Sequence, residues 1–129
     1  MATINTRLIL QSKNLFSNSL NQRVDKAFPI TAEVLKRVKS ITTTSSGSAT
    51  TLLTVSEYGV DKDVFLFIRN RATAKAKYLY IIIGSQQIMR LAPGQYSILP
   101  WRTESGDDLK IYGNDSNGIN VEYLVGTMT

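Results

Sequence analysis

The stretch KYLYIIIGSQQIMRLAPGQYSIL, residues 77–99, decides the fold class of this chain. Residues 77–83 place aromatic and aliphatic side chains on both faces of an extended strand. Gly84 and Ser85 then turn the chain into a second strand at residues 87–91. The next four residues, 92–95, have Pro and Gly where a type II turn requires them, and a third strand follows. Successive strands joined by short turns predict an antiparallel, all-β fold.

Further strands are expected on both sides of this stretch. Residues 64–68 are apolar on both faces, which predicts a central strand. Residues 109–112 and 119–125 flank a turn that contains Asn117-Gly118, a dipeptide suited to positive φ. We therefore expect these two segments to pair with each other as a hairpin.

The segment before residue 64 is less regular. Residues 31–41 fit both the period of a helix and the alternation of a strand, and we favour the strand. Residues 42–51 are nearly all Ser and Thr, which is typical of a loop. A strand at residues 52–56 and a turn over residues 57–63 complete the pattern. About eight or nine short strands with frequent turn signals predict an antiparallel β-sandwich, of which a jelly roll is one form.

The first 30 residues are expected to form an N-terminal arm, with the sandwich domain spanning residues 31–129. The arm begins with alternating residues that suit a half-buried strand or an extended arm: Ile4, Thr6, Leu8 and Leu10 on one side, Asn5, Arg7, Ile9 and Gln11 on the other. Its second half repeats apolar residues every four positions, at Phe16, Leu20, Val24 and Phe28. Ser19 and Gln22 have the spacing of a capping box, and Pro29 closes the stretch, so we expect a short helix here.

Composition narrows the function classes. The 129 residues suffice for one domain with a core. The chain has no Cys and no His, which excludes a disulfide framework, a thiolate nucleophile and the commonest general base. The net charge of +5 is compatible with an acidic partner. No apolar run approaches the roughly 18 residues of a membrane helix, and no signal pattern opens the chain, so we expect a soluble protein made in the cytoplasm.

One group of residues has the composition of a nucleic-acid site. The basic loop formed by Arg69, Arg71, Lys75 and Lys77 lies close in sequence to two tyrosines, Tyr78 and Tyr80, and could offer a phosphate track with stacking platforms. We favour the simpler interpretation of a solvated loop. A second basic cluster at Lys36, Arg37 and Lys39 strengthens the nucleic-acid hypothesis only if the fold places it beside the first.

Other candidate sites have simpler explanations. The acidic and amide residues of neighbouring turns could bind calcium, but they lack EF-hand spacing, and turn chemistry explains them better: Asp107, Asp108, Asn114, Asp115 and Asn117. Glu57, Glu104 and Glu122 could act as glycosidase carboxylates, yet no motif supports this. Trp101 could stack on a sugar ring, although a core or rim position is favoured. We therefore expect no enzyme activity, no metal and no cofactor.

Residues 32–126 resemble the small β-sandwich virion proteins of tailed bacteriophages, notably those of marine and cyanobacterial phages. The matching segments are Val34-Leu-Lys-Arg-Val-Lys-Ser-Ile41, Thr51-Leu-Leu-Thr54, Ile68-Arg-Asn70, Leu91-Ala-Pro-Gly-Gln95 and Val121-Glu-Tyr-Leu-Val125. The opening residues 1–8 are also similar to the start of many phage tail and fibre proteins, although the continuation departs from theirs. The resemblance implies a structural place in a virion and carries no catalytic residues.

These observations lead to one expected function. We expect a non-enzymatic capsid decoration or cement subunit that bridges capsomers, located in the virion and assembled in the bacterial cytoplasm. Its partners would be the major capsid protein or other virion proteins, and it would form a homo-oligomer, with a trimer expected. The alternatives are a tail connector or baseplate protein, a single-stranded nucleic-acid-binding β-barrel and a carbohydrate-binding module. The candidate interface residues are Ile4, Leu8, Leu10, Phe16, Leu20, Lys36, Arg37 and Lys39.

Overall fold

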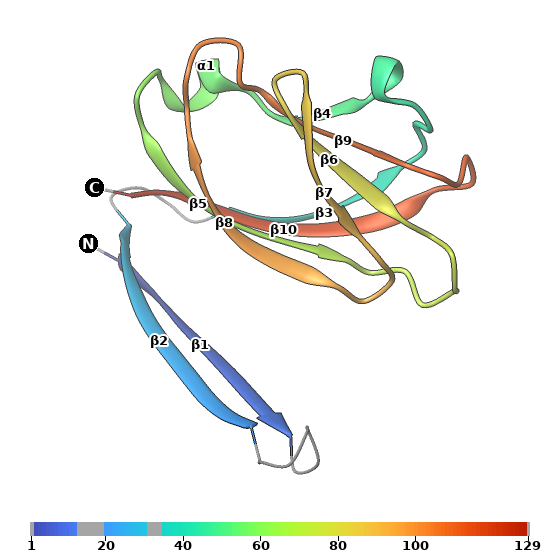
Figure 1. Ribbon diagram of the computed structural model, residues 1–129. Coiled ribbons are helices and arrows are strands. Elements are labelled where there is room, and N and C mark those ends of the chain that lie inside the picture. The colour runs from blue at the N-terminus through green and yellow to red at the C-terminus, as the bar shows by residue number, and fades with distance from the viewer. Residues whose placement is uncertain (1, 13–19, 31–34, 129) are drawn as a thin grey trace.

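Two four-stranded antiparallel sheets pack face to face, and a long β-hairpin projects from one end of them (Figure 1). The computed structural model describes residues 2–12, 20–30 and 35–128. This arrangement confirms the predicted all-β sandwich with an N-terminal extension.

The strand order is nested. The first sheet has the order β3 (Leu35–Ile41), β10 (Ile119–Thr127), β5 (Asp63–Asn70) and β8 (Tyr96–Arg102). The second sheet has the order β4 (Thr50–Leu53), β9 (Leu109–Gly113), β6 (Leu79–Ile83) and β7 (Gln86–Leu91). Within the sandwich, the first strand pairs with the last, the second with the second-last, and so on inward along the sequence: β3 with β10, β4 with β9, β5 with β8, and β6 with β7.

The core lies between the sheets because each strand turns alternate apolar residues inward. On β5, Leu66 and Ile68 are fully buried, and on β6 so are Leu79 and Ile81. Each such side chain contributes about 1.5–3 kcal/mol through burial. Both strands occupy interior positions of their sheets, as the two-sided apolar pattern predicted for residues 64–68.

The expected hairpin between residues 109–112 and 119–125 is wrong. The turn is present, because the Gly118 N–H donates to the Asp115 carbonyl at 3.2 Å and Gly118 has φ +104°. However, β9 lies in the second sheet and β10 in the first, so the two strands face each other across the core. Each strand buries every second side chain. This alternation is the same whether two strands are hydrogen-bonded in one sheet or lie in opposite sheets, so it could not tell the two arrangements apart.

The predicted strand at residues 52–56 is also shorter than expected. β4 ends at Leu53, and the chain then makes a one-turn helix, α1 (Val55–Tyr58). The Glu57 carboxylate accepts from both the Thr54 N–H, at 3.3 Å, and the Thr54 hydroxyl, at 2.9 Å. Tyr58 packs edge-on against Trp101, with ring centroids 5.8 Å apart. Burial, followed by the neighbouring Glu57 charge, raises the pKa of Tyr58. A single 3₁₀ turn at Ser46–Ser48 lies in the Ser/Thr loop.

The N-terminal arm is a hairpin of β1 (Ala2–Ser12) and β2 (Leu20–Ile30). The predicted helix is therefore wrong for residues 20–28, whereas Phe16 and Ser19 lie outside the described residues. A spacing of four is an even number, so it places side chains on one face of a strand as well as on one face of a helix. The strand interpretation of the first ten residues is confirmed for residues 2–10.

The hairpin is fixed at its base. Ile30 is buried and forms a β-bridge with Met128, next to the C-terminal end of the first sheet. Phe28 packs on Phe65 of β5, with ring centroids 5.0 Å apart. Beyond this contact the two strands run away from the sandwich (Figure 1). Within the described ranges, no helix has the length and apolarity to cross a membrane.

Candidate functional site

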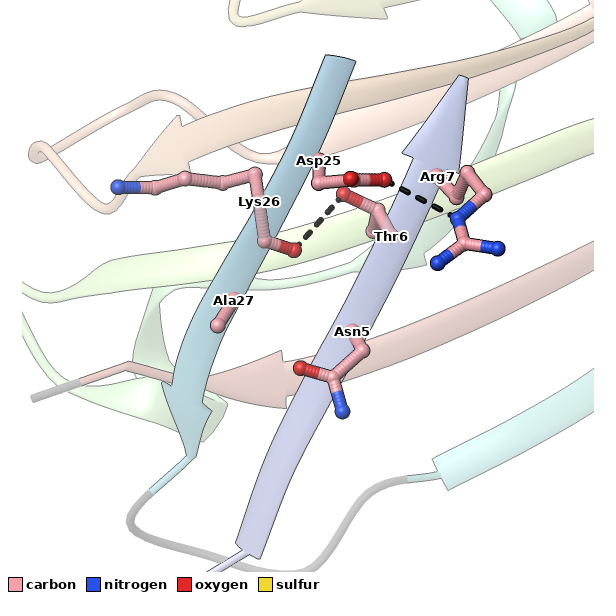
Figure 2. A pocket seen from close by; sticks show the side chains of 6 residues that line it. All are labelled: Asn5, Thr6, Arg7, Asp25, Lys26 and Ala27. Atoms are coloured by element: carbon pink, nitrogen blue, oxygen red, sulfur yellow. Dashed lines mark hydrogen bonds and ion pairs between the residues drawn. The ribbon is translucent and has the colours of Figure 1, made fainter. Parts of the chain in front are cut away.

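The hairpin has one polar and one apolar face. The polar face carries Arg7, Arg23 and Asp25. The Asp25 carboxylate pairs with Arg7 Nε at 3.1 Å and with Arg23 Nε at 2.8 Å. Figure 2 shows the Arg7–Asp25 pair of this face and also Thr6, whose hydroxyl donates to the Lys26 carbonyl at 3.1 Å; by register, the Thr6 and Lys26 side chains belong to the opposite face. The surrounding depression is lined by hairpin residues alone: Asn5, Thr6, Arg7, Asp25, Lys26 and Ala27. Exposed ion pairs such as these contribute little to stability.

The opposite face of the hairpin is largely apolar, with the Thr6–Lys26 pair between its apolar pairs. The register pairs Ile4 with Phe28 and Leu8 with Val24, so these four side chains share one face. Phe28 lies on Phe65, but Leu8 and Val24 are exposed. Of the predicted interface residues, Ile4 and Leu8 lie on this face. Leu10 lies on β1 and Leu20 on β2, and Phe16 falls outside the described part of the chain.

A second apolar surface covers the outside of the first sheet. The register places Leu124, Phe67 and Ile98 side by side on three neighbouring strands. In the adjoining row Val38 and Tyr96 are separated by the charged Glu122 and Arg69. The Tyr96 ring lies 5.9 Å from that of Phe67. We call this surface the outer-sheet patch: Val38, Phe67, Tyr96, Ile98 and Leu124. Val38, Tyr96 and Ile98 are exposed large hydrophobic residues, and Phe67 and Leu124 are half-buried.

The predicted basic interface residues lie on β3, at the edge of the first sheet. Lys36 sits beside Leu124 at the margin of the outer-sheet patch, whereas Arg37 and Lys39 alternate to the other side of the strand. All three are exposed. Charges on an edge strand also oppose unwanted pairing with other strands, so their position fits a protective role as well as a contact role.

The basic loop is divided by the fold. Arg69 lies on the outer face of β5, next to Glu122 of β10, while Tyr80 lies on the second sheet. Arg71 and Lys77 line a common hollow with Gly118 and Asn120.

Both basic residues of this hollow are close to a carboxylate. Arg71 Nε lies 3.7 Å from Glu122, and Lys77 Nζ lies 2.9 Å from Asp115. The hydrogen bond from Lys77 lowers the pKa of Asp115. These carboxylates reduce the positive charge that the loop can offer to a phosphate. Lys75 is exposed and the second basic cluster, on β3, is separated from β5 by β10.

Two tyrosines that were predicted as stacking platforms, Tyr78 and Tyr80, have partners on the second sheet that the sequence did not reveal. Tyr80 of β6 and Tyr112 of β9 stack with ring centroids 4.8 Å apart and an interplanar angle of 13°. The Arg90 guanidinium lies 4.8 Å from the centroid of the Tyr78 ring. Aromatic rings beside a cation can bind planar groups. The strand pairing of β6 with β9 creates this cluster, and no local sequence signal predicts that pairing.

The other candidate sites are occupied by internal contacts. Trp101 is buried, and its indole N–H donates to the Asp107 carbonyl at 3.0 Å, so it is a core residue and not a sugar platform. Asp108 accepts from the Val55 N–H, and Asn114 bonds the backbone at Ala76 and Tyr78. Glu57 caps α1 and Glu122 faces Arg71, while Glu104 follows β8 in a separate loop. In residues 2–12, 20–30 and 35–128, acidic side chains form no group of three or more with metal-binding geometry.

No family model matches this chain, and no curated protein matches it. The features of the chain that bear on its function are the two apolar surfaces described above.

Proposed function

We propose that this protein is a non-enzymatic structural subunit of a tailed-phage virion, specifically a capsid decoration or cement subunit that bridges capsomers. One observation carries the proposal. The hairpin projects from the sandwich and presents an apolar face whose distal side chains, Leu8 and Val24, are exposed. A two-stranded hairpin in water is marginally stable, so this face needs a partner surface. Such a projecting arm is suited to assembly with other subunits.

The nested strand pairs support the same proposal. We infer that the sandwich is a jelly roll, because its four strand pairs are arranged as a single long ribbon folded over on itself. Jelly rolls occur in viral capsid proteins and in lectins, so the fold alone does not decide between particle and ligand-binding roles. The resemblance of residues 32–126 to phage virion proteins favours the particle.

The charge distribution adds a mode of attachment. The net charge of +5 and the exposed basic side chains of β3 favour association with an acidic capsid surface. In this arrangement β3 contacts the capsid through Lys36, Arg37 and Lys39, and the hairpin reaches a neighbouring subunit. Because exposed charges are screened by salt, the attachment would weaken as ionic strength rises.

The test is a comparison of phage particles with and without this protein. We expect mass spectrometry of separated heads and tails to find it in the heads. On heating, particles that lack it should lose DNA at a lower temperature than complete particles. When the salt concentration is lowered stepwise, they should lose DNA sooner, that is, at a salt concentration at which complete particles stay intact. Particles of equal resistance, or a chain absent from purified virions, would contradict the cement role. A chain found only in tails would favour the connector or baseplate alternative.

Single-stranded nucleic-acid binding is a second candidate, supported by the Arg90–Tyr78 contact and the Tyr80–Tyr112 stack on the second sheet. It predicts that the affinity for a labelled oligonucleotide falls steeply between about 50 and about 200 mM salt, because binding to phosphates releases counterions. Tyr80→Ala should weaken such binding at every salt concentration. The absence of binding at low salt would remove this candidate.

A further inference from the structure

The apolar face of the hairpin lacks a cover over its distal half. Leu8 and Val24 lie opposite each other on β1 and β2 and are both exposed. The hairpin cannot turn this face toward its own sandwich while Ile30 and Phe28 hold its base, since the strands run away from the sheets (Figure 1). These side chains are therefore available to a surface outside the same chain.

The outer-sheet patch is the matching surface. Phe67, Ile98 and Leu124 form a continuous apolar row across three strands, and the hairpin of the same chain leaves this row uncovered. The two surfaces already meet at one point within the chain, where Phe28 of the apolar hairpin face packs on Phe65. Phe65 is on the same outer face of β5 as Phe67, so the patch continues directly from a contact of this kind.

The size of the hairpin favours reciprocal exchange. Its base is already packed on its own sandwich through Ile30 and Phe28, which leaves about half of each 11-residue strand free to dock. Half a strand is about 18 Å long at about 3.3 Å per residue, and two strands are about 10 Å wide, so one docked hairpin covers about 180 Å² on each partner. One docking event then buries about 360 Å² in total and two reciprocal events about 720 Å², so reciprocity doubles the contact and gives the area of a weak, concentration-dependent dimer.

We propose that the apolar face of the hairpin docks on the outer-sheet patch of a second copy of this chain, which in return docks its own hairpin on the first. This inference rests on the proposed structural role and names the partner of the hairpin. Each copy then both donates a hairpin and receives one, so the assembly closes and leaves no unused apolar face.

The chain offers closely matched variants for a test. Leu8→Lys alters the apolar hairpin face, and Ile9→Lys alters the neighbouring residue on the polar face, with exposures of 43% and 49%. Ile98→Lys alters the outer-sheet patch, and Ile88→Lys alters β7 of the other sheet, with exposures of 43% and 42%. All four sites are exposed, so the folded sandwich should tolerate them. Val24→Lys provides a second lesion of the apolar face, and circular dichroism verifies folding.

The measurement is the molar mass of the full-length protein by light scattering after size exclusion, over a range of concentrations. We expect a dimer that dissociates on dilution for the natural sequence. Leu8→Lys, Val24→Lys and Ile98→Lys should each raise the dissociation constant at least tenfold, and Ile9→Lys and Ile88→Lys should change it less than twofold. A monomer at the highest concentration, or equal effects of the lesions and their controls, would overturn the proposal.

Mixing two lesions gives the sharpest result. A Leu8→Lys copy keeps an intact patch, and an Ile98→Lys copy keeps an intact hairpin. In their heterodimer one contact is natural and the other carries both lesions, so the mixture should associate more tightly than either variant alone and less tightly than the natural sequence. A mixture that associates no more tightly than the separate variants would contradict a hairpin-on-patch contact and favour hairpin-to-hairpin pairing. Because the test uses purified protein without particles, it is independent of the capsid assay. A monomeric protein whose loss still weakens virions would overturn only this inference.

Discussion

The Phe28 ring lies 5.0 Å from the Phe65 ring at an interplanar angle of 53°, and this contact joins the N-terminal hairpin to the sandwich. Phe65 is buried although it points away from the core between the sheets. The hairpin therefore covers part of the outer face of β5 and depends on that strand for its position.

The contact predicts energetic coupling between hairpin and sandwich. In a double-mutant cycle of Phe28→Leu and Phe65→Leu, we expect a coupling free energy of about 0.5–1.5 kcal/mol, the range for aromatic pairs. Urea unfolding followed by the fluorescence of the buried Trp101 measures it at a fixed protein concentration. Phe28→Leu with Phe67→Leu is the control, because Phe67 packs on Tyr96 and should show no coupling to Phe28. Equal coupling in both cycles would contradict a specific contact.

The conformation of Gly118 indicates that the turn before β10 requires glycine at this position. It has φ +104°, and a Cβ there would lie 2.5 Å from the Ser40 hydroxyl. Gly118→Ala should therefore add a steric cost to the backbone strain of about 1–2 kcal/mol. Gly94→Ala is the control, since Gly94 has φ +78° and open space around it. Ser40→Ala should partly rescue the melting temperature of Gly118→Ala and leave that of Gly94→Ala unchanged. Equal melting temperatures for the two glycine variants would show that Ser40 moves aside freely.

Local patterns predicted most strands because alternation and turn residues act over a few positions. The turn at Gly118 was predicted for this reason, but the pairing of its flanking strands was not. A turn residue reports that the chain reverses, and only the three-dimensional packing decides whether the strands pair in plane or stack across the core. The capping pattern was similarly misassigned. The observed cap links Thr54 to Glu57, whereas the capping spacing in the sequence pointed to Ser19 and Gln22.

The candidate site shows the same division. Ile4 and Leu8 were predicted as one face of a strand because they alternate along a single segment. The outer-sheet patch was not predicted, because Phe67, Ile98 and Leu124 come from three strands whose order depends on long-range pairing. The basic residues and tyrosines of the loop do not form one site, for a related reason. Arg69 and Tyr80 are close in sequence, but the chain passes from one sheet to the other between them.

Replacement of Asn70 is expected to reduce the stability of the fold strongly. Its buried side chain donates to the carbonyls of Lys77 and Leu91, both at 2.9 Å, and accepts from the Ala72 N–H at 2.9 Å. Asn70→Ala should reduce the free energy of unfolding by about 2–4 kcal/mol, because buried backbone groups lose their partners. Asn70→Asp should also destabilise, since a carboxylate would face two carbonyls.

Asn114 supplies the matched control for this prediction. Its side chain also bonds two backbone groups, at Tyr78 and Ala76, but it is exposed, so water replaces the lost bonds. Asn114→Ala should cost about 0.5–1 kcal/mol by urea unfolding, the net value of an ordinary hydrogen bond. A cost for Asn70→Ala no greater than this would show that its three bonds do not stabilise the loop.

The stability of the fold is expected to depend on pH through Asp115. The hydrogen bond from Lys77, followed by one from the Asn117 N–H, holds the pKa of Asp115 below its ordinary value of 3.8. Because the folded-state pKa is lower than the unfolded one, this carboxylate stabilises the fold above the unfolded pKa, and the stabilisation is lost as the pH falls through the folded pKa.

Lys77→Met tests this prediction by NMR titration of the Asp115 carboxyl. The pKa should rise toward 3.8 but stay below it, because the Asn117 N–H still donates. The variant should also lose less stability than the natural sequence between neutral pH and acid. Lys75→Met is the control: Lys75 is exposed in the same loop and carries no ion pair among the described residues, so the Asp115 pKa should not change. An unchanged pKa in Lys77→Met would mean that the Asn117 N–H alone sets it, and that the Lys77 ammonium leaves the carboxylate in solution and is free to bind an anion.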